Sequence, residues 1–219
     1  MSIVVVDLGM GNLRSVTRAL TVALGEMPEA PALIESSDPA VVAAATVAVV
    51  PGQGGFGDCA RALGRGGGAM RQALYERLDA DRPYLGICLG LQCLFGASEE
   101  SPGAEGIGYF GGAVRRFTSG LRDAEGAPLK IPHMGWNDVR PEGPIAALVG
   151  EASYYFVHSY FVEPDPAARA SLSAATTEHG VTFVSALARG AMLGVQFHPE
   201  KSQRAGLSLL RRYFKKVLR

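Results

Sequence analysis

The side chain best suited to nucleophilic chemistry is Cys88, within the segment Tyr-Leu-Gly-Ile-Cys-Leu-Gly-Leu-Gln at 84–92. It lies between Gly86 and Gly90, directly after an apolar run typical of a buried strand and directly before a helical pattern. A nucleophile on such a strand-to-helix turn needs strained backbone angles, and its neighbours two residues away must be small for the chains to approach. The N–H groups that open the next helix also favour a thiolate or a bound anion. A free cysteine is more often a buried structural residue, but this setting predicts that Cys88 is a nucleophile.

A histidine and a carboxylate follow the last apolar strand pattern, in Gly-Val-Gln-Phe-His-Pro-Glu at 194–200. If the extended backbone continues, a period of two puts His198 and Glu200 on the same side, and Pro199 keeps His198 out of the helical region. A carboxylate beside an imidazole holds its tautomer and leaves the other ring nitrogen free to serve a thiol. Glu200 could instead cap the last helix, and the other three histidines lack an acid at this spacing. With the turn around Cys88, this pattern predicts a Cys88–His198–Glu200 triad of nucleophile, base and orienting acid.

Two further groups are expected to complete this site. The turn Pro51-Gly52-Gln53-Gly54-Gly55 follows a strand pattern, so its backbone N–H groups could face a developing oxyanion together with the N–H of Leu89. Taken alone, this turn would be an ordinary glycine-rich loop. Gln92 follows Cys88 by one helical turn and is expected near the same mouth.

The segment Gly9-Met10-Gly11, after the first strand pattern, has the start of a dinucleotide-binding fingerprint. That fingerprint requires a third glycine at position 14, where this chain has Arg14. We therefore expect no nucleotide cofactor, and we expect no metal ion.

Strand and helix patterns alternate in the first half of the chain and place these groups at the ends of strands. Strands are expected at 3–7, 32–35, 47–50 and 84–87, with helices at 12–24, after 38–39 and through about 78. Asn12 is the expected N-cap of the first helix. The second half shows mainly strand patterns, at 112–117, 137–139, 154–161, 172–176, 183–188 and 192–197, before a last helix at 203–217 that would bury Leu207, Leu210, Phe214 and Val217. This order predicts one α/β domain over residues 1–219, with an open, mostly parallel, flavodoxin-like sheet in three layers, helices on both faces and antiparallel additions.

Composition limits the kinds of partner. The 219 residues include 21 Lys plus Arg and 21 Asp plus Glu, so the formal net charge is zero, which argues against bulk attraction to nucleic acid or to an anionic membrane. No apolar run approaches the roughly 18 residues needed to cross a bilayer, and the first residues read as a strand and not as a signal peptide. The three cysteines are an odd number. We therefore expect no disulfide framework, with Cys59 and Cys93 as buried structural residues, and a reducing cytoplasmic setting.

Taken together, these motifs resemble those of the class I, or triad, glutamine amidotransferases. The resemblance covers nearly the whole chain: Pro-Gly-x-Gly at 51–54, Gly-x-Cys-x-Gly-x-Gln at 86–92 and Phe-His-Pro-Glu at 197–200. It implies that Cys88 attacks the carboxamide of glutamine, that Gly52, Gln53, Gly54 and the N–H of Leu89 bind the oxyanion, and that His198, oriented by Glu200, shuttles protons. It further implies that Gln92, Ser159 and Tyr160 position the substrate. Gln53 is larger and more polar than the residue some relatives carry at this position.

Within that family, the segments at 9–16, 132–137 and 197–202 are most similar to the glutaminase subunits of imidazole glycerol phosphate synthases. That resemblance implies that ammonia passes through a tunnel to a separate (β/α)₈-barrel cyclase subunit, which forms imidazole glycerol phosphate and the aminoimidazole carboxamide ribonucleotide in histidine biosynthesis. It also implies an interface with this partner that includes Asn12, Met134, Trp136, Tyr155 and Lys201. Without the resemblance, Met134 and Trp136 would be assigned to the core, and Lys201 to the solvated surface.

Two alternatives remain open at the level of sequence. One is a glutaminase that serves a different synthase, such as one that makes anthranilate or a purine nucleotide, because the triad is shared among these enzymes. The other is a catalytically silent regulatory or nucleotide-binding module on the same fold. The intact triad and the glycines of the anion-binding turn argue against the silent module.

Overall fold

The computed structural model describes residues 1–25, 27 and 30–219. Its first half alternates strands and helices: β1 (Ser2–Val6), α1 (Leu13–Leu24), β2 (Ala32–Ser36), α2 (Pro39–Ala44), β3 (Val47–Gly52), α3 (Phe56–Asp79), β4 (Tyr84–Cys88), α4 (Leu89–Gln92) and β5 (Phe95–Ser98). The second half is mainly strands: β6 (Phe110–Arg116), β7 (His133–Pro141), η1 (Gly143–Ile145), α5 (Ala146–Val149), β8 (Ala152–His158), β9 (Tyr160–Pro164), α6 (Pro166–Ser171), β10 (Ser173–Glu178), β11 (Thr182–Arg189), β12 (Met192–Val195), η2 (Pro199–Lys201) and α7 (Gln203–Val217).

A central sheet runs in the order β2-β1-β3-β4-β12-β11-β10-β7-β8. Its first five strands are parallel, and the next four pair antiparallel. A branch adds β9, which pairs with both β11 and β6, while β6 also pairs with β5. This confirms the predicted parallel sheet with antiparallel additions from the second half of the chain.

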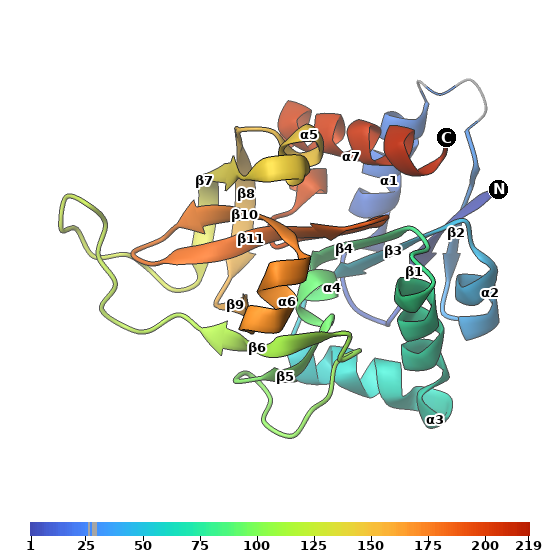
Figure 1. Cartoon of the computed structure of the whole chain (residues 1–219), viewed down its shortest axis with the longest axis horizontal. Helices are drawn as coiled ribbons and strands as arrows, with labels where there is room; N and C mark the ends of the chain where they lie inside the picture. Colours follow the sequence, from blue (N-terminus) through green and yellow to red (C-terminus); the bar gives the residue numbers. More distant parts are fainter. Residues whose placement is uncertain (26, 28–29) are drawn as a thin grey trace.

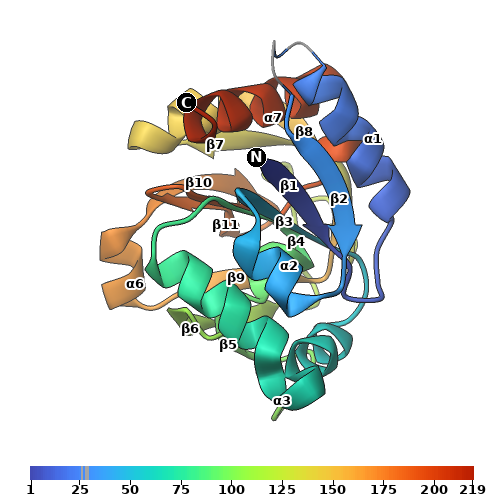
Figure 2. The same ribbon diagram turned by 90° about the vertical axis from the view of Figure 1, so that its right-hand side faces the viewer.

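Helices cover both faces of this sheet, as Figures 1 and 2 show. Helices α1, α5 and α7 lie on one face, and α2, α3 and α4 lie on the other. Each face has its own apolar core: Val5 and Leu20 belong to the first, and Val4 and Leu63 to the second. Adjacent residues of β1 point to opposite faces because side chains alternate along a strand. The three predicted layers are therefore present.

Several predicted elements differ from the structure. The strand expected at 154–161 is two strands, β8 and β9, that separate at Ser159. The helix expected up to residue 78 is interrupted at Arg65–Gly68, where three successive glycines have positive φ values. In α7, Leu210 and Phe214 are buried as expected, but Leu207 and Val217 are only partly buried. Strand β5 and the short helices of the second half were not predicted, because elements of four to six residues carry little periodic signal.

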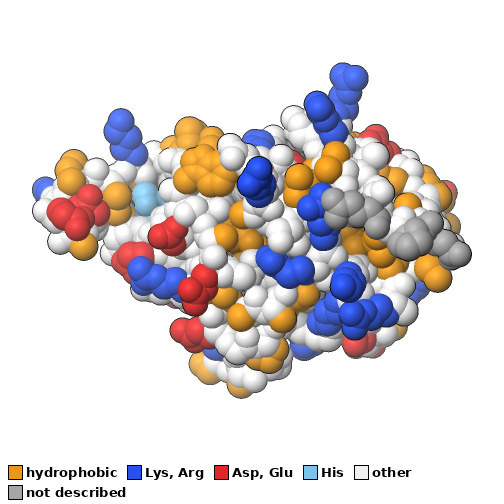
Figure 3. Space-filling model, turned by 90° about the horizontal axis from the view of Figure 1, so that it is seen from above, with side chains coloured by type: hydrophobic (Ala, Val, Ile, Leu, Met, Phe, Trp, Pro, Cys, Tyr) orange, Lys and Arg blue, Asp and Glu red, His pale blue; other side chains and the backbone are white. Residues whose placement is uncertain are grey.

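The face formed by α1 and α7 gathers basic side chains although the whole chain is neutral (Figure 3). Arg14 and Arg18 come from α1, and Arg204, Lys215 and Lys216 come from α7. Among the described residues, no helix is both long enough and apolar enough to cross a membrane.

Candidate functional site

Cys88 is held on a sharp turn between β4 and α4. Its backbone has φ 52° and ψ −103°, a conformation that few residues other than glycine adopt. A Cβ atom at Gly86 would lie 2.6 Å from the Gly90 carbonyl oxygen, and one at Gly90 would lie 1.9 Å from the Val50 carbonyl oxygen. The hydroxyl of Tyr84 donates a 2.7 Å hydrogen bond to the Gly90 carbonyl. The glycines on either side of the cysteine are therefore required sterically, as the sequence pattern predicted.

His198 and Glu200 meet in a buried ion pair. The His198 Nδ1 atom lies 2.7 Å from Glu200 Oε1, and both side chains are at most 2% exposed. His198 is extended, as Pro199 requires. Strand β12 ends at Val195, however, and Glu200 lies in the 3₁₀ turn η2. The predicted juxtaposition is present, but a tight turn produces it and a continued strand does not.

Hydrogen bonds around this turn fix the backbone of His198. The Ser202 hydroxyl donates to the His198 carbonyl at 2.7 Å, and the His198 N–H donates to the Tyr155 carbonyl at 2.9 Å. Glu200 does not cap α7, whose N-cap residue is Ser202. Its carboxylate is thus left to orient the imidazole.

Charges around His198 favour its protonated form. Burial alone lowers the pKa of an imidazole, but the neighbouring Cys88 sulfur and Glu200 outweigh burial and raise the pKa of His198 to about 9. The Nε2 atom of His198 is buried and has no hydrogen-bond partner among the described residues. An imidazolium beside the sulfur stabilises the thiolate, which is the nucleophilic form of cysteine.

A cavity of about 360 Å³ opens in front of this pair. Nine of the predicted residues line it: Gln53, Gly54, Cys88, Leu89, Gln92, Ser159, Tyr160, His198 and Lys201. Gly52 lies just outside it, opposite Cys88 in the β3–β4 register, where a Cβ atom would lie 2.5 Å from the Leu89 side chain. Glu200 lies outside the lining as well, paired with His198. The cavity is therefore formed at the carboxyl ends of β3, β4 and β12, where open α/β sheets place their sites.

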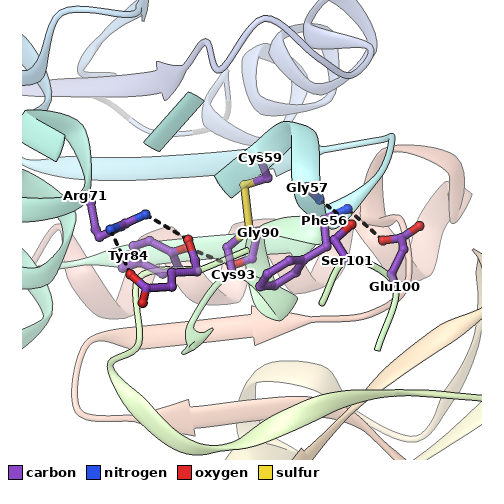
Figure 4. Close-up of a disulfide and its surroundings, with 10 residues drawn as sticks. Phe56, Gly57, Cys59, Arg71, Tyr84, Gly90, Cys93, Glu100 and Ser101 are labelled. Carbon is purple, nitrogen blue, oxygen red and sulfur yellow. Dashed lines mark hydrogen bonds and ion pairs between the residues drawn. A yellow bond between two sulfur atoms is a disulfide. The ribbon is translucent and has the colours of Figure 1, made fainter. Parts of the chain in front are cut away.

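Two residues that the sequence analysis missed also belong to this site. Gln196 donates from Nε2 to the Cys88 sulfur at 3.5 Å, and its Oε1 accepts from Gln92 at 3.2 Å. The signal for Gln196 was its position two residues before His198, on the same side of an extended segment. Glu100 lines the cavity and accepts the N–H of Phe56 at 2.6 Å (Figure 4). No sequence pattern indicated Glu100, which follows β5 and reaches the cavity only through the fold.

Four of the five proposed interface residues form a patch beside the cavity, in which Met134 and Trp136 are exposed and Tyr155 and Lys201 are half-buried. Met134 and Trp136 are 61% and 50% exposed, which excludes their assignment to the core. Trp136 pairs with Tyr155 across β7 and β8, with ring centroids 6.3 Å apart, and the Lys201 ammonium lies 5.9 Å from the Tyr155 ring centroid. Asn12 lies apart from these contacts as the N-cap of α1, where its side chain accepts from Ser15 N–H at 3.1 Å.

The structure corrects one expectation about the cysteines. Cys59 on α3 and Cys93 at the end of α4 form a disulfide, with Cα atoms 7.3 Å apart (Figure 4). Their separation of 34 residues in sequence gave no indication that the two helices would bring them together. Cys88 is free. Among the described residues, no group of three or more His, Cys, Asp or Glu side chains is arranged to hold a metal ion.

The chain resembles known proteins along nearly its whole length. The family model for "Glutamine amidotransferase class-I" matches residues 4–217. The chain is 44% identical to the imidazole glycerol phosphate synthase subunit HisH of Methylococcus capsulatus, with 98% of this chain and 96% of that protein covered. It is 45% identical to the subunit of the same name in Aromatoleum aromaticum, with 95% of each chain covered.

Solved structures show the same fold at low sequence identity. A crystal structure of a glutamine amidotransferase superposes with a TM-score of 0.69 at 17% identity, covering 99% of both chains. The PurLQS structure from Thermotoga maritima gives a TM-score of 0.66 at 16% identity, covering 99% of this chain and 97% of that one. With a family match over residues 4–217 and full-length relatives well above 40% identity, this chain belongs to the class I glutamine amidotransferase family.

Proposed function

We propose that this chain is the glutaminase subunit of an imidazole glycerol phosphate synthase and acts as one domain. The observation that carries the proposal is the Cys88 thiol on its strained turn, in one cavity with an imidazole that a buried carboxylate orients. The choice of synthase rests on the relatives, which are named as subunits of that enzyme.

In the proposed reaction, the Cys88 sulfur attacks the carboxamide carbon of glutamine and forms a tetrahedral intermediate. The N–H of Leu89 and the backbone of Gly52–Gly54 stabilise its oxyanion. His198 Nε2 donates a proton to the leaving nitrogen, so ammonia departs and a γ-glutamyl thioester remains. His198 then takes a proton from water, which attacks the thioester, and glutamate leaves as the Cys88 thiolate is restored.

Other residues of the cavity suit the ends of the substrate. The Glu100 carboxylate lines the cavity and complements the α-ammonium group of glutamine. Gln92, Ser159 and Tyr160 supply neutral polar groups to the same cavity. These groups give the cavity the few placed polar contacts that small-molecule sites use to fix orientation.

Ammonia is then delivered to a (β/α)₈-barrel cyclase that docks on the patch of Met134, Trp136, Tyr155 and Lys201 and on Asn12. An exposed Met and Trp side by side are typical of a protein interface. The patch lies beside the cavity, with Lys201 contributing to both, so a partner bound there would sit next to the source of ammonia.

The test is hydrolysis of glutamine by the purified chain, alone and with the cyclase of the same organism. We expect low activity alone, strong stimulation in the complex, and loss of at least about 10⁴-fold for Cys88→Ala, because the nucleophile is removed. Glu151→Ala, at an exposed position outside the cavity, is the control and should keep the activity. Undiminished turnover by Cys88→Ala would refute the assignment of the nucleophile.

The choice of synthase is tested separately by capture of the chain from its own organism. Recovery of the cyclase supports the proposal, and recovery of an anthranilate or purine synthase in its place would overturn it. The silent-module alternative predicts no glutamate formation under any of these conditions.

A further inference from the structure

Three histidines outside the triad form a buried cluster that has no step in the proposed reaction, and one of them, His158, lines the cavity. His133 and His158 are paired directly across β7 and β8, and His179 stacks on His133 with ring centroids 4.1 Å apart. All three are at most 9% exposed. We propose that Asn137, His133 and His158 are positioning residues that hold the wall of the glutamine cavity through a directed chain of hydrogen bonds ending at the Tyr160 carbonyl. The inference deepens the proposed function and rests on it.

The last acceptor in this series of hydrogen bonds sets which atom donates in each of them. His158 Nδ1 lies 2.8 Å from the Tyr160 carbonyl oxygen, which can only accept, so Nδ1 carries the hydrogen. A neutral His158 then accepts at Nε2, where His133 Nδ1 lies 3.0 Å away and must donate. His133 in turn accepts at Nε2 from Asn137 Nδ2, at 3.1 Å. One set of neutral tautomers satisfies every contact.

The Tyr160 carbonyl joins this chain to the nucleophile. Gln92 Nε2 also donates to that oxygen, at 2.9 Å, and it contacts Gln196 Oε1 at 3.2 Å. Gln196 in turn donates to the Cys88 sulfur at 3.5 Å. Displacement of the Tyr160 carbonyl would therefore release Gln92, which lines the cavity.

The surroundings keep the two histidines uncharged. Phe117, Phe156 and Phe183 pack around them, and burial lowers the pKa of both His133 and His158 to about 3. The titratable groups that face the pair are His179 and His198, which disfavour added positive charge there. Glu178 and Lys130 meet the cluster through their backbone carbonyls. A proton added to Nε2 of either ring would remove an acceptor and break the chain.

Substitution at His158 is the first test of this series of hydrogen bonds. His158→Phe keeps the size of the ring but removes the donor to the Tyr160 carbonyl, and we expect the KM for glutamine to rise about 3- to 10-fold. The rate at which iodoacetamide alkylates Cys88 should change less than about twofold, because the triad is untouched. His158→Asn places an amide donor near the position of Nδ1 and should recover most of the KM.

His179→Phe is the matched control. It alters a ring of the same cluster, but His179 takes no part in the hydrogen bonds from Asn137 to the Tyr160 carbonyl. It should leave the KM unchanged, whereas His133→Phe should raise it, and the double variant with His158→Phe should be no worse than His158→Phe alone. An equal rise in KM for His179→Phe would assign the effect to packing and overturn the inference. If the wild-type protein hydrolyses glutamine and His158→Phe leaves the KM unchanged, the inference is overturned while the proposed function stands.

A second measurement needs neither a variant nor glutamine turnover. Nitrogen and proton chemical shifts of the imidazoles report their tautomers, and at pH 7 we expect both His133 and His158 to carry hydrogen on Nδ1. An Nε2–H tautomer for either residue would break this series of hydrogen bonds and refute the inference, whatever the enzyme activity.

Discussion

At the scale of single residues, the site depends on how three side chains share charge. Cys88 and Glu200 outweigh the burial of His198 and raise its pKa to about 9, which favours the protonated imidazole at neutral pH. In the proposed reaction, that protonated form gives a proton to the leaving nitrogen. The carboxylate contributes orientation and charge but makes no contact with the cavity itself.

Removal of that carboxylate tests this division of roles. We expect Glu200→Ala to lower kcat by about 10²–10⁴-fold, less than Cys88→Ala, because the nucleophile remains while the imidazole loses its orienting partner. The pKa of His198 should fall, since Glu200 is one of the groups that raise it. An imidazole titration by nuclear magnetic resonance measures that pKa. The exposed Glu151 provides the control variant, Glu151→Ala, which should change neither quantity; a His198 pKa that Glu200→Ala leaves in place would contradict the assigned role.

At the scale of elements, the turn between β4 and α4 is set by close backbone approaches. Gly90 packs against the β3 carbonyl of Val50, and Gly52 on the same strand packs against Leu89. These approaches bring the end of β3, which leads into the proposed anion-binding turn, against the first turn of α4. The local glycine pattern and the tertiary contact therefore specify the same geometry.

Gly90→Ala should damage this turn severely. The added methyl group would lie 1.9 Å from the Val50 carbonyl oxygen, so we expect the free energy of unfolding to fall by about 3 kcal/mol, at the upper end for overpacking. The rate of Cys88 alkylation should also change, because the turn that holds the cysteine shifts. Chemical denaturation and alkylation rates measure both effects. Gly96→Ala is the control, since its methyl group would meet only the Gly108 Cα at 3.7 Å; equal losses in the two variants would argue against a specific clash.

At the scale of the whole molecule, the buried histidines couple stability to pH in opposite directions. His133 and His158 have a folded pKa of about 3, below the value of 6.5 for an unperturbed imidazole. Between these values the unfolded chain binds more protons, so the stability they contribute is present above pH 6.5 and is lost as the pH falls. His198, with a folded pKa of about 9, has the opposite sign: its contribution is present below pH 6.5 and is lost as the pH rises through 9.

The contribution of these three histidines to the free energy of unfolding should therefore reach its maximum near pH 6.5. Denaturant titrations at several pH values between 4 and 9 measure the curve. In the double variant His133→Phe/His158→Phe, the decline between pH 6.5 and 4 should be shallower, because two groups that take up protons on unfolding are gone. An identical acid decline in wild type and double variant would show that the carboxylates account for it.

Much of the fold was predictable because its signals are local. The alternation of buried strands and amphipathic helices up to residue 88 identified the parallel sheet, and Asn12 was recognised as an N-cap from its position alone. The break in the strand at Ser159 and the interruption of α3 at Arg65–Gly68 were not foreseen. Apolar residues continue on both sides of Ser159, and helical spacing continues on both sides of the interruption in α3. Periodicity therefore could not reveal either feature.

The sequence by itself determined which residues are candidates for nucleophile and base, because a strained turn between two glycines and a histidine before proline are local requirements of the backbone. Only the tertiary structure decided how these groups are held. A 3₁₀ turn brings Glu200 to His198, and the β7–β8 register places His133 opposite His158. Gln196, just after β12, accepts a hydrogen bond from Gln92 of α4. Such contacts join residues distant in the chain, and their existence depends on register and packing that no short segment specifies.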